Sequence, residues 1–408
     1  MRGPKMENPF IVQREIAYGE AFCDREEEIG KIIDSISRAE AVCLLSPRRY
    51  GKSSLLNQVV GRIQENGWTP VRVDVMEVFS LRDLAGELER KRISALGTWD
   101  RLKQKARDTA AHLKPKVEFD PLSGQPSVSL ELGEPAGGEE ALVRSVLKKM
   151  ISFPKLLDRP VCLVLDEFQE VAALDTKGRI EGVIRGVFQK RPKDFVPIYS
   201  GSRRHMLKLM FEDESAPFYR SARILELGTL SYEKFAMFIQ EQFQKTLRLK
   251  IPETIIKATC RGFDGHPHVL NKIASYLWTR CAIEGKMSNN SMISVWRKIV
   301  LDILEEEKRY YDFANRNIPR YAMAVLREVA KTGIVAAPYS TAFAKTCNLT
   351  PGQIQNAVKV LSKEDKILET ESGIKVMDPL ESACLRVLGQ DRGSQTKSLD
   401  ELLNNTDR

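Results

Sequence analysis

The sequence predicts an α/β protein in which a parallel sheet is flanked by helices, followed by an all-helical segment and a small module of helices and a hairpin. Three observations predict this. Short apolar runs alternate with helical patterns up to about residue 230, which is typical of a parallel sheet. The chain from 231 to about 310 has helical periodicity throughout. From 320 onward, three helical segments precede a short hairpin around Glu371.

The individual elements follow from local patterns. A helix is expected after residue 25, where Ile29, Ile32 and Ile36 recur at helical spacing. A second helix is expected over 53–63. Buried strands are expected at 41–45, 71–75, 161–165, 195–199 and 224–227.

Residues 97–140 interrupt the alternation of strands and helices. They contain prolines at 115, 121, 126 and 135, and two stretches that alternate polar and apolar residues, 116–119 and 127–132. We therefore expect an inserted surface helix and β-hairpin, which contact a partner protein or a neighbouring subunit.

Length, composition and charge narrow the function classes. The 408 residues are enough for two or three domains, and the 42% apolar content is ordinary for a globular chain. No stretch approaches the roughly 20 apolar residues of a membrane span, and the first residues lack the apolar core of a signal peptide, so a cytoplasmic location without a membrane is expected. The seven cysteines never form C-x-x-C, and there are four histidines, which is unfavourable for a zinc site, a disulfide framework or a histidine-rich metal centre. The net charge of +8 permits a nucleic-acid partner without requiring one.

The most informative segment lies between a predicted buried strand and a predicted helix, which is the context of a phosphate-binding loop. Gly51 allows the backbone to approach phosphate oxygens, Lys52 supplies a positive charge, and the Ser53 hydroxyl is the expected Mg²⁺ ligand. The pattern departs from G-x-x-x-x-G-K-[ST] at one position, where Ser46 replaces the first glycine. The alternative is a chance G-K-S at a strand-to-helix turn. The predicted loop comprises Ser46, Pro47, Arg48, Arg49, Tyr50, Gly51, Lys52, Ser53 and Ser54.

Two acids follow the predicted strand at 161–165. Asp166 is expected to hold Mg²⁺, and Glu167 is expected to act as the general base that polarises the attacking water. The alternative is an ordinary strand end with solvated acids. With the phosphate-loop pattern upstream, the pair favours nucleoside triphosphate hydrolysis.

A third predicted strand, 195–199, leads into Ser200, Ser202, Arg203 and Arg204. Because the carboxyl ends of parallel strands share one edge, these side chains are candidates to contact the terminal phosphate. The alternative for the two arginines is ordinary surface exposure.

These segments resemble the archaeal-type ATPase family of AAA+/STAND P-loop ATPases, whose domain order is similar to that of the Cdc6/Orc1 proteins. The resemblance covers about residues 8 to 388 and implies a P-loop AAA+ core at 1–230, a helical lid at 231–318 and a winged helix at 319–388, with 389–408 left as a disordered tail. The motifs that carry it, beyond the phosphate loop, are 8–10, 19–22, 25–26, 165–170, 201–206, 217–219, 265–267 and 378–380.

The resemblance also implies roles for lid residues. Pro267, in Gly-His-Pro, is expected near the adenine ring. His268 stands where many AAA+ lids carry an arginine that senses the terminal phosphate, and Lys272, one turn on, is a candidate substitute. For His266, we favour the interpretation that it packs in the lid or caps a helix.

AAA+ relatives complete their site with an arginine from a neighbouring subunit. Arg220 is the first candidate and Arg223 the second, because both precede the predicted strand at 224–227. A homo-oligomer would follow. The alternative is a structural pairing with the acids at 212–214.

The C-terminal module is predicted to form a helix-turn-helix followed by a wing. Thr350 and Pro351 are typical of a helix start. Gln353, Asn356 and Lys359 would face outward, where a recognition helix contacts double-stranded DNA. The acids at 369 and 371 would repel phosphate. Packing on the ATPase core is therefore the alternative use.

The function predicted from these residues is an ATP-binding, Mg²⁺-dependent, slow ATPase that acts as a nucleotide-controlled molecular switch. Two alternatives remain open: a DNA-binding regulator that resembles replication initiators, and an ATP-binding scaffold with little turnover.

Overall fold

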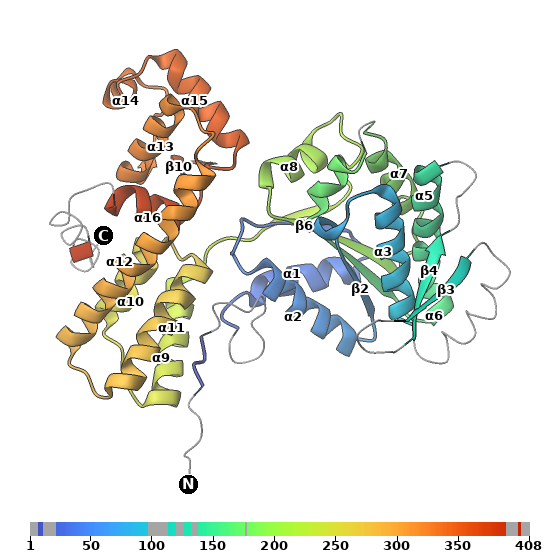
Figure 1. Ribbon diagram of the computed structural model, residues 1–408, viewed down its shortest axis with the longest axis horizontal. Helices are drawn as coiled ribbons and strands as arrows, with labels where there is room; N and C mark the ends of the chain where they lie inside the picture. Colours follow the sequence, from blue (N-terminus) through green and yellow to red (C-terminus); the bar gives the residue numbers. More distant parts are fainter. Residues whose placement is uncertain are drawn as a thin grey trace, which may run out of the picture. The chain divides into compact units, whose positions relative to one another are not determined.

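The chain divides into two units, which are described separately. The computed structural model describes residues 7–10, 22–96, 113–119, 126–132, 138–175, 178–388 and 399–400 (Figure 1). The sheet unit comprises 27–46 and 58–226, and the helical unit comprises 1–26, 47–57 and 227–408. The expected helix in the first part of the insert and most of the expected C-terminal tail, 389–408, lie outside the described residues.

The sheet unit is built on five parallel strands in the order β2-β5-β6-β1-β7. Asp74, the last residue of β2, pairs in register with Asp166 of β5, and Leu45 of β1 pairs with Gly201 of β6. The carboxyl ends of these strands therefore lie along one edge of the sheet, which we call the carboxyl edge. The strands are β1 (Val42–Leu45), β2 (Thr69–Asp74), β5 (Val161–Asp166), β6 (Phe195–Gly201) and β7 (Arg223–Glu226).

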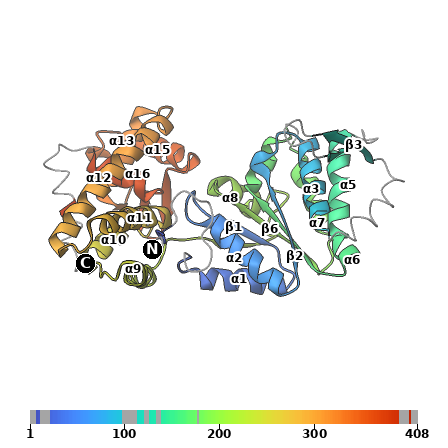
Figure 2. The ribbon, with the colours of Figure 1, turned by 60° about the horizontal axis from the view of Figure 1, so that its bottom comes forward.

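Helices flank this sheet on both faces (Figures 1 and 2). All six residues of β5 and all seven of β6 are buried, as expected for a parallel sheet that is covered on both sides. One core cluster joins α3, α5 and α7 to alternate strand residues such as Val73 and Leu163. The helical segments are α1 (Glu26–Ser37), α2 (Lys52–Glu65), η2 (Val75–Glu77), α3 (Leu81–Ser94), α5 (Gly138–Ile151), α6 (Phe153–Leu157), η3 (Phe168–Ala173), α7 (Ile180–Phe188) and α8 (Arg204–Glu212).

A separate antiparallel hairpin lies between α3 and α5 in the chain. It consists of β3 (Leu113–Phe119) and β4 (Pro126–Leu132), with Val117 opposite Val128. These strands coincide with the two alternating stretches of the insert.

The helical unit begins with four long helices around a common core. Phe10, near the N-terminus, packs against Phe238 and Phe243 at ring-centroid distances of 5.8 and 5.5 Å, so the start of the chain belongs to this core. The helices are α9 (Tyr232–Leu247), α10 (Glu253–Gly262), α11 (Pro267–Glu284) and α12 (Asn289–Ala314).

The remainder of the helical unit is a winged helix with its own core. Thr350 and Gln353 form a reciprocal capping box at the start of α15, and Pro351 occupies its first turn, as the sequence predicts. A two-residue strand, β8, adds a third strand to the predicted hairpin. The elements are α13 (Arg320–Thr332), β8 (Ile334–Val335), α14 (Thr341–Thr346), α15 (Pro351–Lys363), β9 (Ile367–Thr370), β10 (Gly373–Val376) and α16 (Pro379–Val387).

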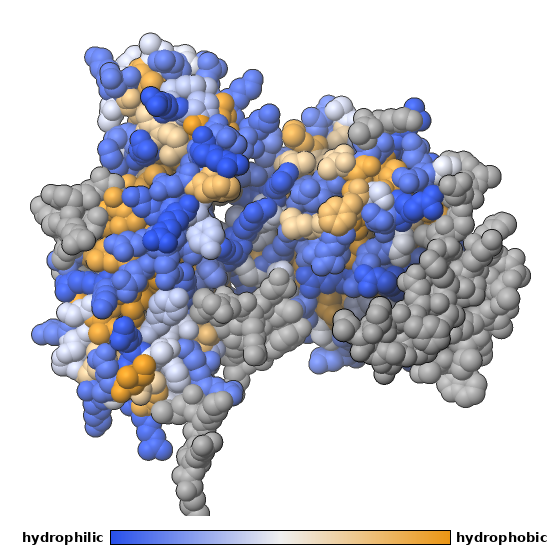
Figure 3. Space-filling model, in the orientation of Figure 1, coloured by the Kyte–Doolittle hydropathy of each residue, from blue (hydrophilic) through white to orange (hydrophobic). Residues whose placement is uncertain are grey.

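Hydrophilic side chains cover most of the face of each unit that is visible in Figure 3. Among the described residues, no helix combines the length and apolar character that crossing a bilayer requires.

Candidate functional site

Asp166 is the most constrained acid at the carboxyl edge. It ends β5 and is 3% exposed. Its Oδ1 accepts a hydrogen bond from Ser200 Oγ at 2.7 Å, and its Oδ2 pairs with Arg72 Nη2 at 2.6 Å. Two neighbouring strands thus hold this carboxylate in one orientation, with its charge balanced by an arginine.

Glu167 follows directly in the left-handed conformation, with φ of 50°. This conformation costs free energy for a residue with a side chain and turns the chain sharply at the end of the strand. The Glu167 Oε2 accepts hydrogen bonds from the Ser202 backbone N–H at 3.0 Å, the Ser202 hydroxyl at 2.8 Å and Gln169 Nε2 at 2.7 Å. The carboxylate that the sequence assigns as general base is therefore fixed by three donors.

Gly201 is required by this arrangement because a methyl group at its α-carbon would overlap the Gln169 side chain. Gln169 is fully buried and donates to Glu167, so a side chain at 201 would displace the group that holds the carboxylate.

Ser200 and the two arginines that follow β6 have different partners. Ser200 is buried, and its hydroxyl donates to Asp166. Arg203 is exposed and lies 3.7 Å from Glu170, whereas Arg204 is buried and pairs with Glu226 of β7. The ion pair of Arg204 favours a structural role for this residue.

Asp74 is a carboxylate at the same edge that the sequence reasoning missed. Burial raises the pKa of its carboxyl group, and the negative charges of Asp166 and Glu167 raise it further. Its Oδ1 accepts from Met76 N–H at 2.9 Å and caps η2. The signal in the sequence was an acid at the end of an apolar strand, the same signal that identified Asp166.

The predicted phosphate loop leaves β1 at Ser46, whose N–H donates to the Gly201 carbonyl at 3.3 Å. Ser46 does not adopt a positive φ, so serine fits where the motif has glycine; the left-handed residues are Arg49 (φ 66°) and Gly51 (φ 84°). Lys52 is the first residue of α2 and is 8% exposed. A buried cation at the positive end of a helix dipole is favourable where an anion binds.

Within the helical unit, the predicted phosphate loop contacts the start of α11 directly. The Tyr50 ring meets the His266 ring edge to face at 4.7 Å, and both side chains are buried. His266 caps α11 by accepting from Val269 N–H at 3.5 Å, which agrees with the packing and capping role expected for it. Arg25, buried as well, donates to the carbonyls of Gly228 at 2.6 Å and Tyr50 at 3.5 Å.

Glu307 of α12 makes a second contact with the phosphate loop. Its carboxylate forms ion pairs with Arg49 of the loop at 3.3 Å and with Lys272 of α11 at 3.2 Å. Burial lowers the pKa of Lys272, but the contacts with Glu306 and Glu307 outweigh it, so the pKa lies above its ordinary value. Lys272, the expected candidate to replace a phosphate-sensing arginine, is thus a cation held by two acids of α12.

Arg220 and Arg223, the two candidates for an arginine that reaches a neighbouring subunit, have different surroundings. Arg223 is tied to α1, with Nη1 3.1 Å from Ser35 Oγ and 3.8 Å from Asp34. Arg220 is exposed, and its guanidinium lies over the ring of Tyr219 at 5.1 Å. Among the described residues, no ion pair joins Arg220 to the acids at 212–214, so Arg220 remains the better candidate for contact with a neighbour.

The comparisons with known proteins agree with this architecture. A family model described as a probable winged helix domain matches residues 309–386. The Walker-type ATPase PABY2304 of Pyrococcus abyssi superposes with a TM-score of 0.59 at 20% identity, over 93% of this chain and 100% of that one. The ORC2 protein of Aeropyrum pernix, in ADPNP–ADP complexes, superposes with a TM-score of 0.56 at 14% identity, over 98% of each chain. The chain has an AAA+ ATPase fold. No curated protein sequence matches it.

The predicted fold class and the resemblance in domain order are therefore confirmed: an AAA+ core with a parallel sheet is followed by a helical segment and a C-terminal winged helix. Within the described part of this AAA+ fold, no three His, Cys, Asp or Glu side chains gather as a metal site.

His268 leads to a prediction about pH. Burial and the positive charge of Arg49 lower its pKa to about 4. The unfolded chain, with a histidine pKa of about 6.5, binds the proton more readily, so the stability contributed by neutral His268 is complete above pH 6.5 and is lost as the pH falls toward 4. As the pH is lowered from 6.5 to 4, the free energy of unfolding should fall in both proteins. The fall should be larger in the parent than in His268→Gln, by on the order of 1–3 kcal/mol. Urea denaturation at a series of pH values measures this; parallel profiles would contradict it.

Proposed function

We propose that the chain binds ATP with Mg²⁺, hydrolyses it slowly and acts as a nucleotide-controlled switch. The observation that carries this proposal is the direct contact of the phosphate loop with the lid, through Tyr50 on His266 and Arg49 on Glu307. A change of the loop on binding phosphate would act on lid residues without an intermediary.

The residues present fit the cofactor, because Lys52 is a buried cation in the first turn of α2 and Asp166 is a carboxylate at the end of β5. Lys52 at the start of α2 would neutralise the β- and γ-phosphates, while Ser53 and Asp166 would hold Mg²⁺. Glu167 would accept a proton from the attacking water. The bound Mg²⁺ would supply charge neutralisation on the phosphates. The roles of the other loop residues, of Ser200 and of Pro267 beside the adenine belong to the same proposal.

The switch would extend from the lid to the winged helix. Asp264 precedes the Gly-His-Pro turn, and its carboxylate pairs with Lys375 of β10 at 2.5 Å. His266, two residues on, packs against Tyr50 of the loop. The same turn thus contacts both the phosphate loop and the wing. We propose that a core (1–230), a lid (231–318) and a winged helix (319–388) respond to nucleotide through this turn.

Equilibrium binding of a fluorescent ATP analogue, combined with phosphate release, tests the proposal. Saturable binding and slow, Mg²⁺-dependent phosphate release are expected. Binding without release would favour the scaffold alternative, and the absence of saturable binding would overturn the proposal.

DNA-controlled regulation is a second candidate because Asn356 and Lys359 of α15 are exposed, as a recognition helix requires. Gln353, however, is engaged in the capping box, and Glu369 and Glu371 of the wing are exposed. Duplex binding with a steep dependence on salt would support this candidate, since phosphate contacts release counterions.

If Arg220 completes the site of a neighbouring chain, ATP turnover per chain should rise with protein concentration. Arg220→Ala should abolish this rise without weakening ATP binding, because the side chain would act only in trans. Arg223→Ala, which loses the bond to Ser35, is the matched control and should keep the rise. A turnover rate that is constant with concentration, together with a monomeric mass in ATP, would contradict an oligomeric site.

The inserted hairpin is proposed to contact a partner protein or another copy of the chain. Replacing 112–136 with a short Gly-Ser linker should leave ATP binding unchanged, because β3 and β4 pair only with each other in the sheet topology of the described residues. Equilibrium nucleotide binding and circular dichroism measure this. Loss of folded protein would show that the hairpin is structural instead.

A further inference from the structure

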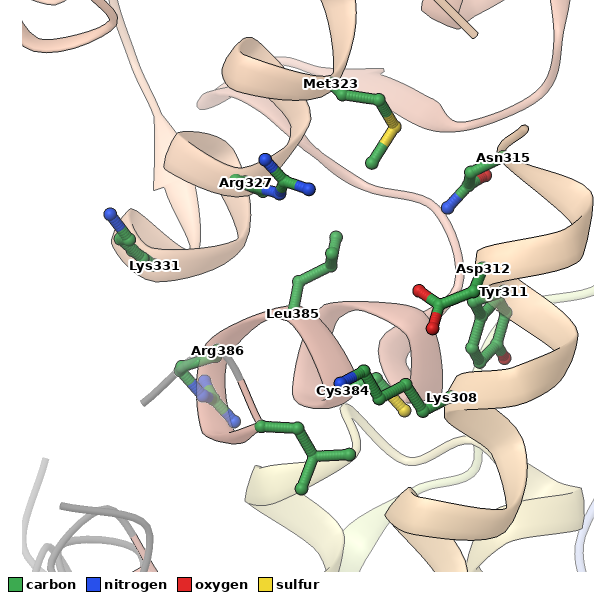
Figure 4. Close-up of a pocket in the computed structure, with 11 residues that line it drawn as sticks. Lys308, Tyr311, Asp312, Asn315, Met323, Arg327, Lys331, Cys384, Leu385 and Arg386 are labelled. Atoms are coloured by element: carbon green, nitrogen blue, oxygen red, sulfur yellow. The ribbon is translucent and has the colours of Figure 1, made fainter. Parts of the chain in front are cut away.

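A pocket of about 470 Å³ lies between α12, α13 and α16, where the lid meets the winged helix (Figure 4). Its volume is in the range of small-molecule sites. Met323, Leu385 and Leu388 contribute apolar surface. Figure 4 shows that Arg327 and Asp312 point into the pocket from different helices.

The charged lining is strongly unbalanced. Four cations, Lys308, Arg327, Lys331 and Arg386, surround the pocket with a single acid, Asp312. Lys331 pairs with Glu328 at 3.3 Å, whereas neither Lys308 nor Arg327 has an ion pair within the described residues. Cations placed around a concave surface without matching acids are typical of a site for a phosphate or carboxylate group.

A buried hydrogen-bond network fixes one wall of the pocket. Asn315 of α12 lines the pocket and is 8% exposed. Its Nδ2 donates to Glu381 Oε1 at 2.6 Å, and Lys366 Nζ donates to the same carboxylate at 3.0 Å, so the Asn315 amide is fixed with nitrogen toward Glu381. The Asn315 Oδ1 is left without a hydrogen-bond partner in the described part of the chain. Because this oxygen is enclosed by protein, the network contributes a fixed wall and not an acceptor for a ligand.

We propose that this pocket binds a small phosphorylated compound that also carries hydroxyl groups. The phosphate would lie among Arg327, Lys308 and Lys331, and a hydroxyl group would donate to the Asp312 carboxylate. The site is distinct from the phosphate loop and does not depend on ATP hydrolysis. Because the lining comes from α12 on one side and from α13 and α16 on the other, the bound compound would stabilise the packing of the winged helix on the lid.

Isothermal titration of the full chain with ribose 5-phosphate tests the proposal, with ribose and inorganic phosphate as comparison ligands. Ribose 5-phosphate should bind saturably and more tightly than either comparison ligand. Arg327→Gln should weaken this binding about tenfold or more, since a charge-assisted contact to phosphate is lost. Asp312→Asn should reduce the preference for ribose 5-phosphate over inorganic phosphate.

Two controls keep the result specific. Lys345→Gln, an exposed cation of α14 outside the pocket, and Lys52→Ala in the phosphate loop should both retain the binding. Equal binding by Arg327→Gln, loss of binding in Lys52→Ala, or no preference over inorganic phosphate would overturn the proposal. So would failure of ribose 5-phosphate to bind while duplex DNA binding is lost in Arg327→Gln, because the cations would then serve a nucleic-acid backbone.

Discussion

Glu167→Gln should lower ATP turnover by at least about 100-fold while leaving the affinity for ATP unchanged, because general-base catalysis typically contributes a factor of this size or more. The glutamine can still accept from Ser202 and Gln169, so the geometry at the end of β5 is retained while the basic oxygen is lost. Phosphate release under saturating ATP measures turnover, and a fluorescent analogue measures affinity. A parent-like rate would show that Glu167 is not the base.

Lys52→Ala, in contrast to Glu167→Gln, should lose affinity for ATP. Removing the buried cation at the start of α2 should weaken ATP binding by about 10- to 100-fold, as expected for a charge-assisted contact. Glu212→Gln, at the exposed end of α8, is a matched charge change outside the carboxyl edge and should behave as the parent in both assays.

Glu381→Ala should be among the most destabilising single substitutions in the helical unit. Glu381 is 2% exposed and binds Lys366 at 3.0 Å and Asn315 at 2.6 Å. Burial raises the pKa of Glu381, an effect that Lys366 opposes. Removing the carboxylate leaves the largely buried Lys366 ammonium unpaired, which typically costs about 3 kcal/mol. Urea denaturation followed by circular dichroism measures the free energy of unfolding.

Glu328→Ala is the control for this substitution. Glu328 pairs with Lys331 at 3.3 Å on the more exposed surface of α13, and pairs of this kind contribute at most about 1 kcal/mol. Equal losses of stability in Glu381→Ala and Glu328→Ala would contradict the importance assigned to the buried pair.

Local patterns in the sequence were sufficient to predict most elements. The apolar run before Asp166 predicts β5, because a strand covered on both faces of a sheet must be apolar throughout. Thr350 and Pro351 predict the start of α15, because capping depends on neighbouring residues alone. The strand β8 was missed because two residues carry no periodicity.

Contacts between distant parts of the chain could not be predicted in this way. Arg72 and Asp166 meet because β2 and β5 are neighbours in the sheet, a strand order that no local pattern encodes. Arg25 binds the carbonyl of Gly228, more than 200 residues later, and nothing near Arg25 in the sequence indicates that partner. The orientation of Glu167 depends likewise on Ser202 and a left-handed backbone, which become visible only in three dimensions.

Nucleotide at the phosphate loop is proposed to change the lid and the winged helix. Hydrogen–deuterium exchange of the Glu167→Gln protein without nucleotide, with ADP–Mg²⁺ and with ATP–Mg²⁺ measures this change. ATP should change the protection of both 263–269, around the His266 turn, and 367–376, the wing, and ADP should give a different pattern. Identical exchange of both segments in all three states, with ATP demonstrably bound, would contradict the switch.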